Sequence, residues 1–271
     1  MIPKPRHLEP EYGAQFKDRS IVEAYQYRPP YPAETFEILA GLTTGEPRVV
    51  LDVGCGRGDI ARELVKFVER VDAVDFSTNM IETGKKLPGG ANPNINWLIG
   101  AVEEVPLTSP YALVTAGASL HWMDWYVVLP RFREILFPGG YLAIVDTETE
   151  PEWWDGELGP VIRHYSTNRY FQPYDLIEEL EKRNLFQKCG EKETAPIPFI
   201  QPIEEFIESF HSRNGLSRER MGEEMAAAFD KEVGELVSPS AKDGMLEFQV
   251  TAKVIWGIPQ PFTENRKEIA Q

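Results

Sequence analysis

The chain has 271 residues, a formal net charge of −15 and two cysteines, Cys55 and Cys189. This length suits one large domain, or a domain with a smaller cap. The acidic balance without clustered Lys and Arg argues against a nucleic-acid partner. Two separated cysteines predict neither a disulfide framework nor a metal site. Because we find no apolar run of membrane-spanning length and no secretory leader, we expect a cytoplasmic protein with no membrane partner.

The first segment, residues 11–31, is rich in aromatic side chains and ends in a run of prolines. Pro29 and Pro30 interrupt any helix there, whereas Pro32 suits the first turn of the helix that follows. That helix should end in the glycine-containing stretch 41–45. The aromatic side chains suit either a cover over a ligand or a plug at the edge of a sheet.

Residues 49–65 predict a strand, a tight turn and a helix. A buried strand that ends in Asp52 and Val53 is followed by glycines at 54, 56 and 58 and then by a helix with an apolar face. Free backbone N–H groups and the positive end of a helix favour a polar cofactor at such a turn. A dinucleotide fingerprint needs a glycine at position 59, which is Asp59, so a nicotinamide cofactor is disfavoured. An ordinary tight turn is the alternative.

The second strand, residues 71–76, contains Asp75 at the distance from the glycine turn that a ribose-binding acid requires. A carboxylate at the end of this strand suits both ribose hydroxyls. Ser77 is a good N-cap for the helix that follows. The alternative role for Asp75 is to cap that helix.

A loop over residues 87–94 precedes a short third strand, and residues 111–116 form a fourth, which ends at Ala116. His121 and Trp122 follow it, where ligands sit in an open α/β sheet. Histidine suits proton removal near neutral pH, but the pair also fits a packed polar corner. Asp124 should cap the next helix, after which residues 141–146 form a strand.

The remainder combines aromatic, helical and extended stretches. Trp153 and Trp154 fit either the wall of a substrate pocket or the core of a small helical cap. We predict a helix at 175–183, extended chain at 185–200 and two helical segments between 202 and 237. From Leu246 to Trp256 apolar and polar residues alternate, which predicts a strand with one packed face and one solvent-exposed face.

The run D-V-G-C-G-R-G, residues 52–58, resembles the first motif of class I S-adenosylmethionine-dependent methyltransferases. The H-W-M-D run at 121–124 resembles the trans-aconitate-type small-molecule group of that family. The resemblance implies S-adenosylmethionine as the cofactor. It also implies an α/β fold with a Rossmann-like, seven-stranded, mostly parallel sheet, an antiparallel last strand, helices on both faces and helical cap insertions.

The resemblance further assigns roles to residues. A leading Y-x-x-R-P-x-Y-P pattern folds over the cofactor as a lid in such enzymes, which would bring Tyr25 and Arg28 near the methionine end. The residues expected to bind the cofactor are Tyr25, Arg28, Asp52, Gly54, Gly56, Gly58, Asp75, Phe76, Met80, Ala101, Val102, Glu103 and Ala116. Those expected at the substrate are Trp122, Trp153 and Trp154, with His121 as the catalytic residue.

The expected reaction is in-line methyl transfer to a small molecule, most favourably to a hydroxyl or carboxylate oxygen. His121 would be the base for a hydroxyl, thiol or amine, whereas His121 or Arg28 would only orient a carboxylate. The alternatives are a non-catalytic binding module for S-adenosylmethionine and a nicotinamide-dependent oxidoreductase. We predict a lid and first helix at 1–45, the cofactor-binding core at 46–150, a cap with a sixth strand at 151–244, and a last strand and tail at 245–271.

Overall fold

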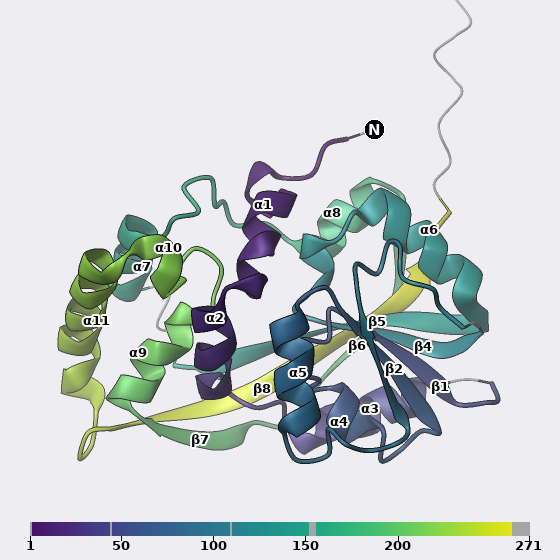
Figure 1. Ribbon diagram of the computed structural model, residues 1–271, viewed down its shortest axis with the longest axis horizontal. Helices are drawn as coiled ribbons and strands as arrows, with labels where there is room; N and C mark the ends of the chain where they lie inside the picture. Colours follow the sequence, from purple (N-terminus) through teal and green to yellow (C-terminus); the bar gives the residue numbers. More distant parts are fainter. Residues whose placement is uncertain (1, 44, 109, 152–155, 262–271) are drawn as a thin grey trace, which may run out of the picture.

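The computed structural model describes residues 2–43, 45–108, 110–151 and 156–261, which form a central mixed sheet with helices on both faces (Figure 1). The strand order is β3-β2-β1-β4-β5-β8-β6, and β7 also pairs with β8. The strands are β1 (Val49–Val53), β2 (Arg70–Asp75), β3 (Ile95–Ile99), β4 (Tyr111–Gly117), β5 (Leu136–Glu150), β6 (Phe186–Glu193), β7 (Ile197–Pro202) and β8 (Met245–Pro259). The pairs among β1 to β5 are parallel, whereas β8 runs antiparallel to β5, β6 and β7. The expected fold class is confirmed, but the described part of the chain forms a sheet of eight strands rather than seven.

The two faces of the sheet are apolar, and each is covered by its own set of helices. In β1, Leu51 packs into the cluster that contains α6 (Trp125–Ile135), whereas Val50 packs into the cluster that contains α3 (Ala33–Leu42) and α4 (Ala61–Leu64). A strand buried on both faces needs an almost continuous apolar run, which β1 has. The helices are α1 (Pro10–Gly13), α2 (Arg19–Ala24), α3 (Ala33–Leu42), α4 (Ala61–Leu64), α5 (Thr78–Lys86), α6 (Trp125–Ile135), α7 (Leu158–Tyr165), α8 (Leu176–Lys182), α9 (Ile203–His211), α10 (Arg218–Met221) and α11 (Glu223–Val237).

Three elements differ in length or number from the sequence prediction. The helix after the glycine turn is confined to α4, because beyond Val65 the backbone forms i to i−3 hydrogen bonds, from Lys66 to Glu63 and from Phe67 to Leu64. The strand expected at 141–146 belongs to the longer β5. The two helical segments expected between 202 and 237 are three helices, because Gly222, at φ +79°, separates α10 from α11.

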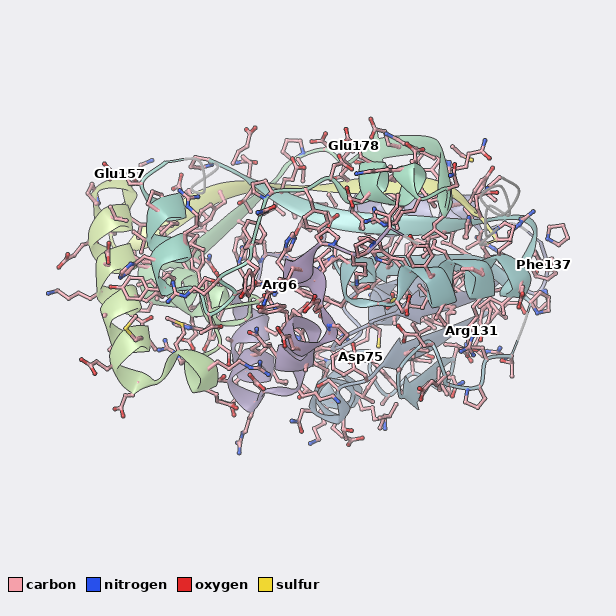
Figure 2. The ribbon with its side chains drawn as sticks, turned by 90° about the horizontal axis from the view of Figure 1, so that it is seen from above. Arg6, Asp75, Arg131, Phe137, Glu157 and Glu178 are labelled. Carbon is pink, nitrogen blue, oxygen red and sulfur yellow. The ribbon has the colours of Figure 1, made fainter. Side chains whose placement is uncertain are left out.

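A helical cap of α7, α9, α10 and α11 lies at one end of the molecule (Figure 1). Its core surrounds Phe210 and Phe229 and includes Leu246 and Phe248 from the first part of β8. The long strand β8 therefore contributes residues to the core of the cap and also belongs to the central sheet, so it connects the two. The predicted domain boundaries stay predictions, and Trp153 and Trp154 lie outside the described residues. Figure 2 shows Glu157, in the cap, and Phe137 at opposite ends of the molecule.

The N-terminal segment, residues 2–28, lies between the cap and the sheet (Figure 1). On the sheet side, the Lys4 ammonium donates hydrogen bonds to the carbonyl oxygens of His121 and Met123, at 2.8 and 2.9 Å. On the cap side, the backbone N–H of Gly215 donates to the side chain of Gln15 at 3.0 Å. The segment thus connects the two halves. Within the described ranges, we find no helix that is both long enough and apolar enough to cross a membrane.

Candidate functional site

Two adjoining cavities lie at the carboxyl ends of the parallel strands. The smaller cavity, of about 100 Å³, lies beside the ends of β1 and β2, and the larger, of about 920 Å³, extends toward α3 and the end of β5. The residues lining both cavities are Phe16, Tyr25, Gly54, Gly117, Ala118 and Trp122. This is the position at which open α/β sheets bind ligands.

The glycine turn shapes the wall of these cavities. Gly54, Gly56 and Gly58 have φ of +61°, +55° and +72°, the left-handed region in which a Cβ is strained. A Cβ on Gly54 would lie 2.5 Å from the Ser119 Cβ, and one on Gly58 would lie 2.4 Å from the Trp97 ring. A Cβ on Gly56 would meet nothing within 4 Å. The fold therefore requires the first and third glycines, whereas Gly56 leaves bare backbone beside open space.

Asp75 lies at the end of β2, where Figure 2 shows it near the boundary between the N-terminal segment and the sheet. Its Oδ2 accepts a hydrogen bond from the backbone N–H of Gly56 at 2.8 Å, and its Oδ1 accepts from that of Ser77 at 2.7 Å. The side chain lines the smaller cavity, and burial raises its pKa. Each carboxylate oxygen keeps a second lone pair for a ligand hydroxyl. Asp75 thus supports the turn before α5 and still faces the cavity.

Asp52, at the end of β1, has a carboxylate with an unused oxygen. Oδ1 accepts a 2.9 Å hydrogen bond from the Thr115 hydroxyl, whereas Oδ2 has no hydrogen-bond partner among the described residues. The residue is only 1% exposed but contributes to the wall of the larger cavity. Burial raises the pKa of Asp52 to about 7, even though the Thr115 hydrogen bond opposes this shift. An orphaned buried oxygen of this kind suits a ligand that brings a donor.

Five of the residues expected to bind the cofactor come together at the smaller cavity. Phe76, Met80, Ala101, Val102 and Glu103 all line the smaller cavity. Their loop is positioned by a residue that sequence reasoning missed. Arg131, on α6, donates to the carbonyl oxygens of Val102 at 2.9 Å and of Glu103.

Tyr25 and Arg28, the residues of the predicted lid, line the cavities, but most of the side-chain hydrogen bonds of Arg28 go to the cap. Arg28 donates from Nε to the Ser212 hydroxyl at 2.7 Å and from Nη2 to the Ser212 carbonyl oxygen at 2.6 Å. Its Nη1 donates to the Tyr25 hydroxyl at 3.1 Å, and its guanidinium carbon lies 4.1 Å from the Tyr25 ring centre. Tyr25 lines both cavities, and Arg28 lines the larger one. The segment that covers the site is thereby fixed to α9.

His121 and Trp122 belong to a short 3-10 helix after β4, Leu120–Trp122, and their ring centres are 4.6 Å apart. Trp122 lies in the wall shared by both cavities, 5.6 Å from the ring of Phe16. His121 lines the larger cavity. Burial, followed by the nearby charges of Lys4, Arg28 and His7, lowers the pKa of His121 to about 3. The imidazole is therefore neutral at physiological pH and a weak base.

Two predicted cofactor residues, Gly58 and Ala116, line neither of these cavities. Gly58 packs under Trp97, and Ala116 is buried within β4.

Sequence reasoning missed Ser119 and Met123 in the smaller cavity and Arg57, Asp146 and Arg213 in the larger. The position of Asp146 at the end of a predicted strand was a usable signal, whereas Arg213 follows a distant cap helix and carried none. Among the described residues, no group of three or more His, Cys, Asp or Glu is arranged to hold a metal ion.

Comparisons with known proteins point to one family. Residues 50–140 match the family described as "Methyltransferase domain". An uncharacterized methyltransferase of Mycobacterium tuberculosis is 36% identical over 147 residues, which cover 53% of this chain and 57% of that protein. Trans-aconitate 2-methyltransferase of Azoarcus sp. is 31% identical over 111 residues, covering 40% and 42% of the two chains. The chain spans about half the length of the curated relatives it matches.

Solved structures share the fold over most of the chain. The YcgJ protein of Bacillus subtilis aligns with a TM-score of 0.53 at 16% identity, covering 84% of this chain and 99% of that one. A SAM-dependent methyltransferase of Thiobacillus denitrificans, solved in complex with S-adenosyl-L-homocysteine, aligns with a TM-score of 0.50 at 13% identity, covering 89% and 97%. At such identities these two likenesses show the fold alone.

Proposed function

We propose that this protein, whose residues 50–140 form a class I S-adenosylmethionine-dependent methyltransferase domain, transfers a methyl group from that cofactor to an oxygen, hydroxyl or carboxylate, of a small molecule. The observation that carries the proposal is the pairing of Asp75 with the backbone of Gly56 beside open space. There a carboxylate and bare backbone meet in one cavity. A relative named malonyl-[acyl-carrier protein] O-methyltransferase supports an oxygen acceptor, and one named trans-aconitate 2-methyltransferase supports a small-molecule acceptor.

The residues that line the smaller cavity suit the nucleoside end of the cofactor. Phe76 and Met80 offer an aromatic and a thioether surface to the adenine. The loop of Ala101, Val102 and Glu103 lies in the same wall. Asp75 would accept hydrogen bonds from the ribose hydroxyls through the lone pairs that Gly56 and Ser77 leave unused.

The methionine end carries an ammonium and a carboxylate, and the wall of the larger cavity offers groups of opposite charge. The unpartnered Oδ2 of Asp52 suits the ammonium. Arg57 suits the carboxylate, because its buried Nε has no partner among the described residues. The Tyr25 ring contacts both Arg28 and Arg57, whose guanidinium carbons are 4.1 and 5.4 Å from its ring centre. Cation–π contact would hold both cations at this end.

When bound, the cofactor supplies a sulfonium methyl group that is already electrophilic. The protein then has to align the acceptor with that group and to exclude water, which can contribute roughly 7 to 11 kcal/mol. Trp122 and Phe16, in the shared wall, cover the junction of the cavities. The neutral imidazole of His121 would orient the acceptor through a hydrogen bond. Trp153 and Trp154 stay predicted acceptor contacts.

Calorimetric titration of the purified protein with S-adenosylhomocysteine and with NADH tests the cofactor. We expect binding of S-adenosylhomocysteine and none of NADH, and preferential binding of NADH would contradict the proposal. Incubation with methyl-labelled cofactor and a panel of small alcohols, phenols and acids then tests the transfer. Cofactor binding without transfer to any of them would favour the non-catalytic binding module.

A further inference from the structure

Asp146 lies where the two cavities meet. It follows Val145 on β5, which pairs with Gly117 at the end of β4 and whose carbonyl oxygen accepts the Ala118 N–H at 2.9 Å. Gly117 and Ala118 belong to the shared wall, and Asp146 itself lines the larger cavity. Within the described part of the chain, its carboxylate has no hydrogen bond or ion pair. An unpaired carboxylate therefore borders the acceptor side of the junction.

Tyr31 places a hydroxyl at the same junction. A Cβ on Gly117 would lie 2.7 Å from the Tyr31 hydroxyl oxygen, so this oxygen sits against the end of β4. Burial, together with Tyr25, Asp146, Asp59 and Asp52, raises the pKa of Tyr31 well above its usual value. The phenol therefore keeps its proton and serves as a donor.

His121 is poorly suited to take up a proton in the same cavity. Its surroundings are cationic, because Lys4 donates to its carbonyl oxygen and Arg28 lies nearby. With a pKa of about 3, the imidazole accepts a hydrogen bond but does not retain a proton near neutral pH. If the acceptor carries a proton, the base that removes it must therefore be another residue of the cavity wall.

We propose that Asp146 accepts the proton of an acceptor hydroxyl seated between its carboxylate and the hydroxyl of Tyr31. This inference rests on the proposed methyl transfer. The acceptor oxygen forms a bond to the methyl carbon while the carbon–sulfur bond breaks, the electron pair of that bond stays on sulfur, and the O–H proton passes to Asp146. A carboxylate acceptor has no proton to give and would be repelled. The acceptor class is therefore an alcohol or a phenol.

The charged and titratable neighbours of Asp146 agree with this role. Asp146 is exposed on the wall of the open larger cavity, but partial desolvation by the surrounding protein and, less strongly, Glu148 on the same strand raise its pKa, which makes the carboxylate a better proton acceptor. Tyr31 and Tyr174 face it as neutral phenols. Lys253 is its register partner on β8, and its ammonium pairs with Glu191 at 3.2 Å.

Ligand-observed NMR on the protein loaded with S-adenosylhomocysteine tests the acceptor class without turnover. The probes are matched pairs, benzyl alcohol with benzoate and 1,4-butanediol with succinate. We expect the alcohols to bind at least fivefold better than the carboxylates, and Asp146→Asn to abolish this preference. A preference for the carboxylates, or one that Asp146→Asn leaves unchanged, would overturn the proposal.

Turnover tests the proton transfer. With the alcohol and phenol panel, Asp146→Asn should lower the rate by roughly 10² to 10⁴-fold and should remove the rise of rate with pH. Glu150→Gln is the control, because Glu150 lies on the same strand but lines neither cavity. Tyr31→Phe should mainly raise KM for the acceptor.

Full activity of Asp146→Asn, or transfer by the wild type to carboxylates alone, would refute the role of Asp146 and leave the methyltransferase proposal standing. Failure of the wild type to bind S-adenosylhomocysteine would overturn both.

Discussion

The Oδ2 atom of Asp75 accepts a hydrogen bond of 2.8 Å from the backbone N–H of Gly56, so the acid that ends β2 fixes the turn that follows β1. A second bond between the same segments, from the N–H of Cys55 to the carbonyl oxygen of Val74 at 2.9 Å, extends the connection. The proposed ribose site and the glycine turn are therefore one structural unit. A change in either should alter cofactor binding.

Replacing Asp75 tests this unit directly. Asp75→Ala removes the acceptor for the ribose hydroxyls and for the Gly56 N–H, and we expect the affinity for S-adenosylhomocysteine to weaken by about 1 to 3 kcal/mol. Titration calorimetry measures the affinity, and the melting temperature reports any loss of folding. Glu82→Gln, an exposed change on α5 in an ion pair with Lys85, is the control and should bind as the wild type does. Unchanged affinity of Asp75→Ala would remove this residue from the site.

Gly56 and Gly58 should respond differently to alanine. Gly56→Ala places its Cβ in open space, so its cost in folding should be only the conformational strain of about 1 to 2 kcal/mol, while the methyl group intrudes where the cofactor would lie. Gly58→Ala would force its Cβ against the Trp97 ring and should destabilise the fold more. Denaturant melts and cofactor titrations of both variants separate the effects. Cofactor binding by Gly56→Ala at wild-type strength would show that the bare backbone faces no ligand.

Asp52 should make the cofactor-free protein less stable as the pH rises. Its pKa is about 7 in the folded chain against an ordinary value of 3.8, so the unfolded chain releases this proton first. Between about pH 4 and pH 7 the free energy of unfolding should therefore fall, at up to about 1.4 kcal/mol per pH unit from this group. Above pH 7 its contribution should be constant.

Asp52→Asn cannot titrate, and we expect it to flatten this pH dependence while it weakens binding of S-adenosylhomocysteine. Urea melts at a series of pH values, with and without the ligand, measure both effects. Thr115→Val removes the hydrogen bond to Oδ1 but keeps the carboxyl group, so it should retain the slope. An identical slope in wild type and Asp52→Asn would contradict the assignment of this titration to Asp52.

Much of the site follows from local sequence patterns. The glycine turn and the acid that ends β2 are brought together because β1 and β2 are adjacent parallel strands, which end at the same edge. The caps are equally local. Ser77 accepts from the Met80 N–H at 3.4 Å, and Asp124 accepts from that of Tyr126 at 3.0 Å, as predicted. The sequence predicts these caps because each of them depends only on residues a few positions apart.

The rest depends on contacts between distant segments, which leave no periodic signal. Arg28 and Ser212 are 184 positions apart, and their hydrogen bonds are visible only after the cap has folded onto the N-terminal segment. Arg131 likewise supports the 101–105 loop from a helix whose own pattern only indicates an apolar face. The eighth strand was missed because β7 is short and contains prolines, which made a single edge strand the natural prediction for residues 185–200.

The contact between Arg28 and Ser212 should control how firmly the cap holds the lid. Arg28→Lys keeps the charge but loses the two-point contact with the Ser212 hydroxyl and carbonyl oxygen and the stacking on Tyr25. We expect docking of α9 to weaken by about 1 to 3 kcal/mol, which should speed hydrogen exchange of its amides and raise KM for the cofactor. Arg19→Lys is the matched control, because Arg19 is exposed on α2 and, among the described residues, pairs with Glu23 in its own helix. If exchange in α9 were equally slow in both variants, the cap would be held by other contacts and the lid would not depend on Arg28.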